Sequence, residues 1–295
     1  MNSGPVELNE QASTFMHRGI ALMNTGAPDA LREAVQCFDD AIALRRKLPL
    51  AENAEFRYGL AAGLINRGDA LTRLCDAARI DEAISSHTEA IGLLESLPLD
   101  DNALYLKRLA VAWINRGIAL EAKGDAPALA EAIASFQKVV DFMGASPQAA
   151  NAEFALIRAV ALINHAGASL HSAGDAAAPA ARADAESALA LLNQCNGAEL
   201  PVAEAGLKAR HALCRALVSQ LSALAPEDES TRLDLAGQIT DAVEEGLRLV
   251  RDWARAGVNG FRPLGAQLFQ VGTLVYERSQ PQFLADFLLD HLDPE

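Results

Sequence analysis

A 49-residue period is the feature that most constrains the fold of this 295-residue chain. The tetrapeptide Ile-Asn-Arg-Gly occurs at 65–68 and again at 114–117, and residues 163–164 begin a third, looser copy. Aligning 57–105 with 106–154 without a gap gives 17 identities in 49 positions. The same interval separates Pro49, Pro98 and Pro147, also Asn53, Asn102 and Asn151, and also Phe56, Tyr105 and Phe154. A period of about 20–50 residues is typical of stacked supersecondary units, so we predict a repeat array.

Each period contains two segments with helical spacing. In the first segment of the second copy, Leu60, Leu64, Gly68 and Leu71 lie on one stripe at about 100° per residue. A break at 76–78 precedes a second apolar segment, which ends before Pro98 because proline cannot continue a helix. The residues placed to cap the next first helix are Asn53, Asp101 with Asn102, and Asn151. We therefore predict helical hairpins near 6–48, 51–97, 100–144, 148–195 and 200–254.

The C-terminal part of the chain departs from the repeat. In the fifth unit, Leu213-Cys214-Arg215-Ala216 replaces the tetrapeptide, and atypical terminal units are expected where an array ends. Residues 257–295 are rich in aromatics, and the segment that begins at Pro281 has one apolar face, formed by Phe283, Leu284, Phe287, Leu288 and Leu292. We predict a repeat domain at 1–256 and C-terminal capping helices at 257–295. The alternative is that the last helix binds a partner.

The composition excludes several classes of protein. The net charge is −14, with no stripe of Lys and Arg, so nucleic acid is not expected as a direct partner. No apolar stretch reaches the roughly 18 residues that span a bilayer, and the first ten residues lack a signal pattern. The four cysteines form no metal-ligand pattern and are expected to be free and mostly buried. The prediction is a cytoplasmic protein that is not bound to a membrane.

The third copy resembles the tetratricopeptide repeat. The matching residues are Trp113, Asn115, Gly117, Ala119, Leu120, Gly124, Asp125, Ala132, Phe136 and Pro147, and other copies match at Gly19, Ala34 and Phe38 and at Gly68, Ala83 and Ala90. The resemblance implies an all-α, right-handed superhelical solenoid of about five antiparallel helical hairpins with a C-terminal capping element. It also implies that the first helix of each hairpin lines a concave groove. The unit here is about fifteen residues longer than the family's usual repeat of about 34, which alters the groove.

The asparagine of the tetrapeptide is the main candidate for ligand binding. Asn66 lies about 200° around the helix from the packing stripe, and Asn115 and Asn164 are its equivalents. In some members of the family an asparagine at the matching place binds the backbone of an extended peptide. A carboxamide can both donate to and accept from a peptide unit. The alternative is a structural asparagine; Asn115, between Val111 and Ile118, is expected to be partly buried with a fixed partner.

Other polar residues near this stripe divide into two groups. The groove candidates that accompany the asparagines are His17, Asp69 and Arg73. Asp69 and Glu121 are expected to belong to a solvated face. The tetrapeptide arginines, which are Arg18, Arg67 and Arg116, lie at the border of the packing stripe, where we expect each to pair with a nearby acid.

No catalytic motif is present, and the six histidines are scattered. We therefore expect a non-catalytic scaffold that needs no cofactor or metal and binds a partner protein or an extended peptide in its concave groove. One alternative is an accessory subunit that positions a substrate for a separate enzyme. Another is an enzyme whose site the superhelix assembles from distant hairpins. A homo-oligomer formed through the C-terminal region is a further alternative.

Overall fold

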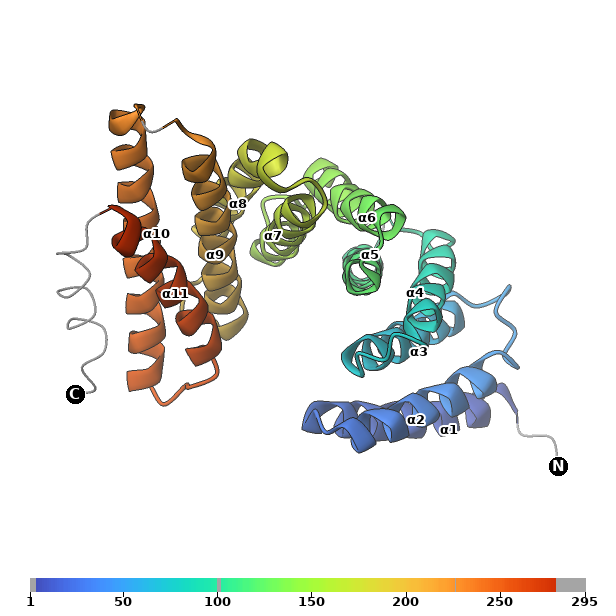
Figure 1. Cartoon of the computed structure of the whole chain (residues 1–295). Coiled ribbons are helices and arrows are strands. Elements are labelled where there is room, and N and C mark those ends of the chain that lie inside the picture. The colour runs from blue at the N-terminus through green and yellow to red at the C-terminus, as the bar shows by residue number, and fades with distance from the viewer. Residues whose placement is uncertain (1–3, 100–101, 226, 280–295) are drawn as a thin grey trace. The chain divides into compact units, whose positions relative to one another are not determined.

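The computed structural model describes residues 4–99, 102–225 and 227–279, and within these ranges the chain is helical and contains no strand (Figure 1). The α-helices are α1 (Pro5–Thr25), α2 (Pro28–Arg45), α3 (Ala54–Arg73), α4 (Ile80–Glu95), α5 (Ala103–Lys123), α6 (Ala126–Ala145), α7 (Ala152–Ala173), α8 (Ala178–Leu192), α9 (Leu200–Ala223), α10 (Glu229–Arg255) and α11 (Arg262–Ser279), with a 3-10 helix, η1 (Gly174–Ala177), before α8. The chain forms two compact units, residues 1–142 and 143–295, whose boundary lies within α6.

Each predicted hairpin range contains two helices, with ends that local chemistry explains. Asn53, Asn102 and Asn151 cap α3, α5 and α7, as predicted, and each side chain accepts a hydrogen bond of 2.8–2.9 Å from the backbone N–H two residues later. Asp101, the other predicted cap, lies outside the described residues. At the C-terminal ends of α1 and α5, Gly26 and Gly124 have φ of 70° and 76°, the left-handed conformation that ends many helices.

In the first unit, α3 packs against α1, α2, α4 and α5, and α5 also packs against α4. The first helices of successive repeats are thus neighbours, and α2 and α4 both lie against α3 (Figure 1). The apolar side chains between them are almost wholly inaccessible, for example Leu60 and Leu64 of α3 and Leu94 of α4. Because α3 packs against α2 and α4, its polar side chains lie either beside these two helices or on the side of α3 that faces away from them.

A ring packed on a glycine joins the two helices of each repeat in this unit. A Cβ at Gly19 would lie 2.6 Å from the ring of Phe38, and one at Gly117 would lie 2.4 Å from the ring of Phe136. His87 occupies the equivalent place against Gly68. All three rings are fully buried. The small residue of the tetrapeptide is therefore required for the close approach of the two helices.

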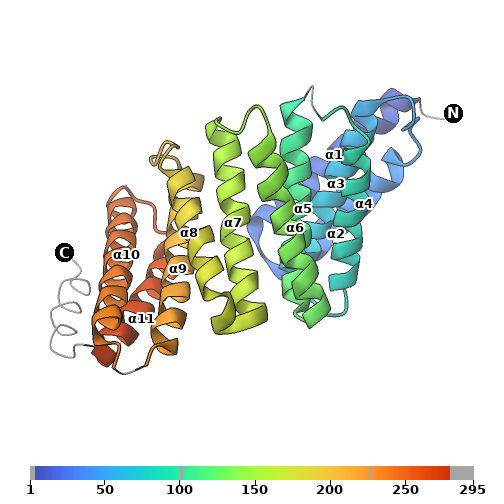
Figure 2. The ribbon, with the colours of Figure 1, turned by 90° about the horizontal axis from the view of Figure 1, so that it is seen from above.

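The second unit has an alanine-rich part and an aliphatic part. Between α7, α8 and α9 the core consists largely of alanines, among them Ala166 and Ala185, which stand 49 residues after Gly117 and Phe136. Between α9, α10 and α11 it contains larger side chains, such as Leu207, Ile239 and Leu268. Figure 2 shows α10 and α11 beside α9.

One sequence prediction needs correction, and another concerns residues outside the described ranges. Only Cys37 and Cys214 are buried, whereas Cys75 is exposed and Cys195 is intermediate; all four are free. Cys75 is exposed because it lies in the turn between α3 and α4. The apolar face predicted for the segment after Pro281 falls outside the described residues.

Candidate functional site

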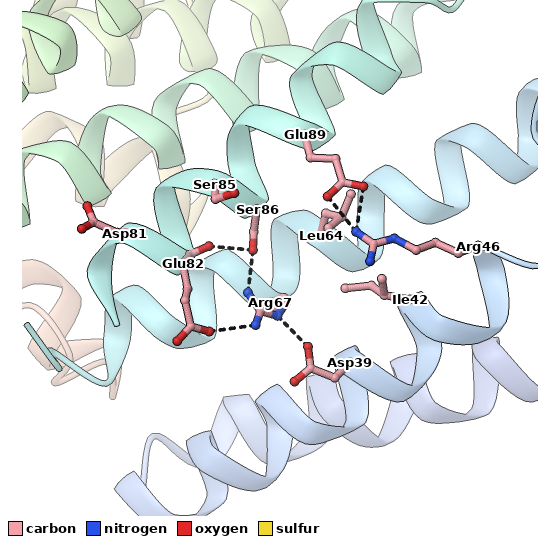
Figure 3. A pocket seen from close by; sticks show the side chains of 10 residues that line it. All are labelled: Asp39, Ile42, Arg46, Leu64, Arg67, Asp81, Glu82, Ser85, Ser86 and Glu89. Atoms are coloured by element: carbon pink, nitrogen blue, oxygen red, sulfur yellow. Dashed lines mark hydrogen bonds and ion pairs between the residues drawn. The ribbon is translucent and has the colours of Figure 1, made fainter. Parts of the chain in front are cut away.

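The tetrapeptide arginine of the second repeat connects three helices. Arg67 of α3 donates through Nε to Asp39 of α2 at 2.6 Å, and through Nη2 to Glu82 of α4 at 2.9 Å (Figure 3). Its Nη1 donates to Ser86 of α4 at 2.8 Å, and the Ser86 hydroxyl in turn donates to the backbone carbonyl of Glu82. The Arg67 side chain is only 18% exposed. This arginine therefore holds one repeat to the next, as its predicted border position indicates.

The same arrangement recurs 49 residues later. Arg116 donates to Glu131 and Ser135 of α6 and, through Nε, to Thr88 of α4 at 3.1 Å. In the first repeat, Arg18 pairs with Glu33. In the second unit, the equivalent of Arg116 is His165, whose Nδ1 lies 2.7 Å from Asp184 Oδ2. The predicted pairing of the three tetrapeptide arginines with nearby acids is confirmed.

A cleft opens above Arg67, between α2 and α4, with α3 as its floor. Its volume is about 470 Å³, and its lining residues are Asp39, Ile42, Arg46, Leu64, Arg67, Asp81, Glu82, Ser85, Ser86 and Glu89 (Figure 3). Arg46 spans the cleft and donates from Nη2 to both carboxylate oxygens of Glu89, at 2.8 and 2.9 Å. Hydrogen bonds from Arg79 and Arg67 lower the pKa of Glu82 to about 2. Four carboxylates and two guanidiniums line the cleft, so its lining is net acidic, and Arg79 and Lys123, which do not line it, pair with Glu82 and Asp81.

The contacts of Arg67 were not predicted from the sequence in detail, although a signal for them is present. Glu82 and Ser86 lie 15 and 19 residues after Arg67, and Glu131 and Ser135 have the same spacing from Arg116. The hydrogen-bond partners of these arginines thus repeat at the same 49-residue interval as the arginines themselves. In contrast, the pair formed by Arg46 and Glu89 has no equivalent in the next repeat, where the two positions are Glu95 and Lys138.

The three candidate asparagines share one environment, which differs from that of the arginines. Asn66, Asn115 and Asn164 are all half-buried. None of their side chains forms a hydrogen bond with another residue in the part of the chain that the structure describes. The expectation that Asn115 is partly buried is confirmed, but the fixed partner expected for it is not found among those residues. Ile118, one turn further along α5, is 38% exposed.

The other groove candidates differ in exposure. His17 of α1 and Arg73 of α3 are exposed. Asp69 of α3 is half-buried, so it is less exposed than a fully solvated face would make it. Burial raises the pKa of the Asp69 carboxyl above its usual value, and the charge of Arg73 opposes this effect. Asn66, Asp69 and Arg73 follow one another at helical spacing along α3, and Asn115 is the equivalent of Asn66 on the neighbouring α5.

The described residues contain neither a metal-binding cluster nor a membrane-spanning helix. No group of three or more His, Cys, Asp or Glu side chains among them is arranged to hold a metal ion. None of the described helices combines the length and the apolar character needed to cross a membrane. No protein-family model matches the chain, and comparison with curated proteins gave no significant match.

Proposed function

We propose that this protein is a non-catalytic scaffold that binds an extended segment of a partner protein through the first helices of its repeats. The binding residues are Asn66 and Asn115 in the first unit and Asn164 in the second. The helix pairs of the chain are, in this proposal, antiparallel hairpins of a right-handed solenoid that resembles the tetratricopeptide repeat. The first helices α3, α5 and α7 would present one carboxamide each to the ligand.

The observation that supports the proposal is the contrast between neighbouring residues of the tetrapeptide. Arg67 and Arg116 each form three side-chain hydrogen bonds within the protein. The adjacent asparagines are half-buried, and their carboxamides form no such bond in the described part of the chain. Because a half-buried polar group without a partner loses hydration, it gains from a ligand that supplies both a donor and an acceptor. A peptide backbone supplies both.

The experiment is affinity purification from the native host with the wild-type protein and with the variant Asn66→Ala/Asn115→Ala/Asn164→Ala. Partners identified by mass spectrometry are then tested as purified proteins. We expect the triple variant to bind its partner at least tenfold more weakly, because each lost hydrogen bond contributes about 1 kcal/mol. Its thermal unfolding should be unchanged within about 0.5 kcal/mol per site, because these side chains support no other residue.

A matched control removes carboxamides from the second helices. Gln36 of α2 and Gln137 of α6 are exposed, and each donates a hydrogen bond to an aspartate one turn further along its own helix. The variant Gln36→Ala/Gln137→Ala should retain full affinity. If the asparagine variant binds as tightly as the wild type while remaining folded, the asparagines are not the binding residues.

A further inference from the structure

The carboxylate of Asp69 is unusual among the acids of this protein. It is half-buried, yet no ion pair or hydrogen bond joins it to any other residue in the described ranges. Arg73, one turn further along α3, influences it through charge but does not form an ion pair with it. By comparison, Asp39 of α2 and Glu82 of α4 both pair with Arg67, which is on α3 like Asp69. A partly desolvated carboxylate without a partner costs folding free energy, which a bound cation would recover.

The equivalents of Asp69 in the neighbouring repeats are apolar. Counting 49 residues in each direction from Asp69 gives Ile20 of α1 and Ile118 of α5. Both helices pack against α3. Ile118 is 38% exposed, which makes it one of the few large apolar side chains on the surface of the first unit. This face of the first helices therefore offers the carboxylate of Asp69, with the cation of Arg73 one turn further along α3, and an accessible aliphatic side chain at the equivalent position of the next first helix.

The partner chemistry that fits this arrangement is a long basic side chain. The ammonium of lysine or the guanidinium of arginine pairs with a carboxylate, while the methylene groups of the same side chain cover apolar surface. The net charge of −14 also favours the approach of a basic segment. A neutral or acidic segment would leave Asp69 desolvated and unpaired.

We propose that the extended segment bound by this protein contains a lysine or arginine whose charged group pairs with Asp69 and whose methylene groups lie on Ile118. In this arrangement Asn66, one turn before Asp69 on α3, bonds to the peptide backbone and Asp69 selects the side chain. This inference rests on the proposed function and adds the sequence preference of the ligand.

The test is selection of peptides from a phage-displayed library of random linear peptides with the full-length wild-type protein. The tightest binders are synthesised with a fluorescent label, and their affinities are measured by anisotropy. We expect the selected peptides to share a lysine or arginine. The variant Asp69→Asn should weaken them at least tenfold. Replacing the shared lysine by norleucine, or the shared arginine by methionine, should produce the same loss with the wild type and no further loss with Asp69→Asn.

A matched control separates this pairing from a general effect of net charge. Asp29 of α2 has a side chain that is 98% exposed, so Asp29→Asn removes the same charge at a distant place and should leave the affinity unchanged. The variant Asp69→Asn should unfold at the same temperature as the wild type or higher, because the carboxylate it removes has no partner.

The two proposals fail in different ways. Selected peptides that lose affinity with Asn66→Ala but share no basic residue, or that bind Asp69→Asn as well as the wild type, overturn the role of Asp69 and leave the backbone-binding role of the asparagines. A selection in which no peptide depends on Asn66 or Asn115 overturns the proposed function together with this inference.

Discussion

His87 is a histidine at a position where the neighbouring repeats have phenylalanine, and this difference has a clear physical consequence. Phe38, His87 and Phe136 are equivalent in register, and only the histidine has polar ring atoms. Neither nitrogen of His87 has a hydrogen-bond partner in the described part of the chain. Burial, with a contribution from the charge of Arg116, lowers the pKa of His87 to about 4. The folded protein therefore contains a neutral, unsatisfied imidazole in its core.

We predict that His87→Phe stabilises the protein and makes it less sensitive to acid. The ring fits, because Phe38 and Phe136 pack against glycines in the same way. Removing two unsatisfied nitrogens should raise the free energy of unfolding by about 1–3 kcal/mol near neutral pH. Since the His87 pKa falls from 6.5 to about 4 on folding, the unfolded chain binds more protons between these values, and stability decreases as the pH falls through them.

The measurement is urea unfolding of the wild type and His87→Phe at several pH values. The difference between them should grow by about 3 kcal/mol between neutral pH and pH 4, which is most of the value of that pKa shift. Other titrating groups are common to both proteins and cancel in the comparison. A difference that is constant with pH would contradict a neutral, buried His87.

Cys75 is the second residue that departs from its repeat. It has φ of 52° at the end of α3, whereas its equivalents at the ends of α1 and α5 are Gly26 and Gly124. A side chain in the left-handed region costs about 1–2 kcal/mol, part of which glycine returns through the greater entropy of the unfolded chain. We predict that Cys75→Gly raises the free energy of unfolding by about 0.5–1 kcal/mol, measured by urea unfolding. Cys75→Ala, which removes the thiol but keeps the Cβ, should show no gain; an equal gain would indicate that the thiol is responsible.

At the scale of helices, the ion pairs differ in what they hold together. Arg67 is 18% exposed and bonds to α2 and α4, whereas Arg18 is 62% exposed and pairs with Glu33 of α2. Exposed pairs contribute about 0–1 kcal/mol, while hydrogen bonds to partly buried charged groups contribute about 1.5–3 kcal/mol. We predict that Arg67→Met lowers the free energy of unfolding by about 2–3 kcal/mol and Arg18→Met by less than about 1 kcal/mol, measured by thermal and urea unfolding. Equal losses would show that Arg67 does not join successive repeats.

The helices were predictable because the signals that define them are local and repeated. The caps at Asn53, Asn102 and Asn151 recur at one interval, as does the glycine beneath each ring. A single 49-residue register therefore located most helix ends in the first four repeats. The accessibility of individual side chains was less predictable. Asp69 was assigned to a solvated face because its helical position lies away from the packing stripe of its own hairpin, whereas the structure shows that it is half-buried. The cleft between α2 and α4 also depends on packing, because its lining residues come from three helices.

At the scale of the whole chain, the stability of a repeat array is approximately a sum of local terms. The two tryptophans allow this to be tested, because Trp113 belongs to the first unit and Trp253 to the second. Trp113 lies under the ammonium of Lys138, at 4.4 Å from the ring centroid. Trp253 packs edge to face with Phe261 at 5.8 Å. Each indole therefore has its own environment, which is lost when its unit unfolds.

We predict that a substitution in the first unit changes the unfolding reported by Trp113 more than that reported by Trp253. His87→Phe is introduced into Trp253→Phe, where Trp113 is the only tryptophan, and into Trp113→Phe, where Trp253 is the only one. Comparison within each background cancels the effect of the tryptophan replacement. The urea midpoint reported by Trp113 should rise as the stabilisation of His87→Phe requires. The midpoint reported by Trp253 should rise by less than half as much, because His87 and the glycine it packs on, Gly68, both belong to the first unit. Equal shifts of the two midpoints would instead mean that residues 1–142 and 143–295 unfold as one cooperative body, and that interactions between repeats exceed the local terms throughout the chain.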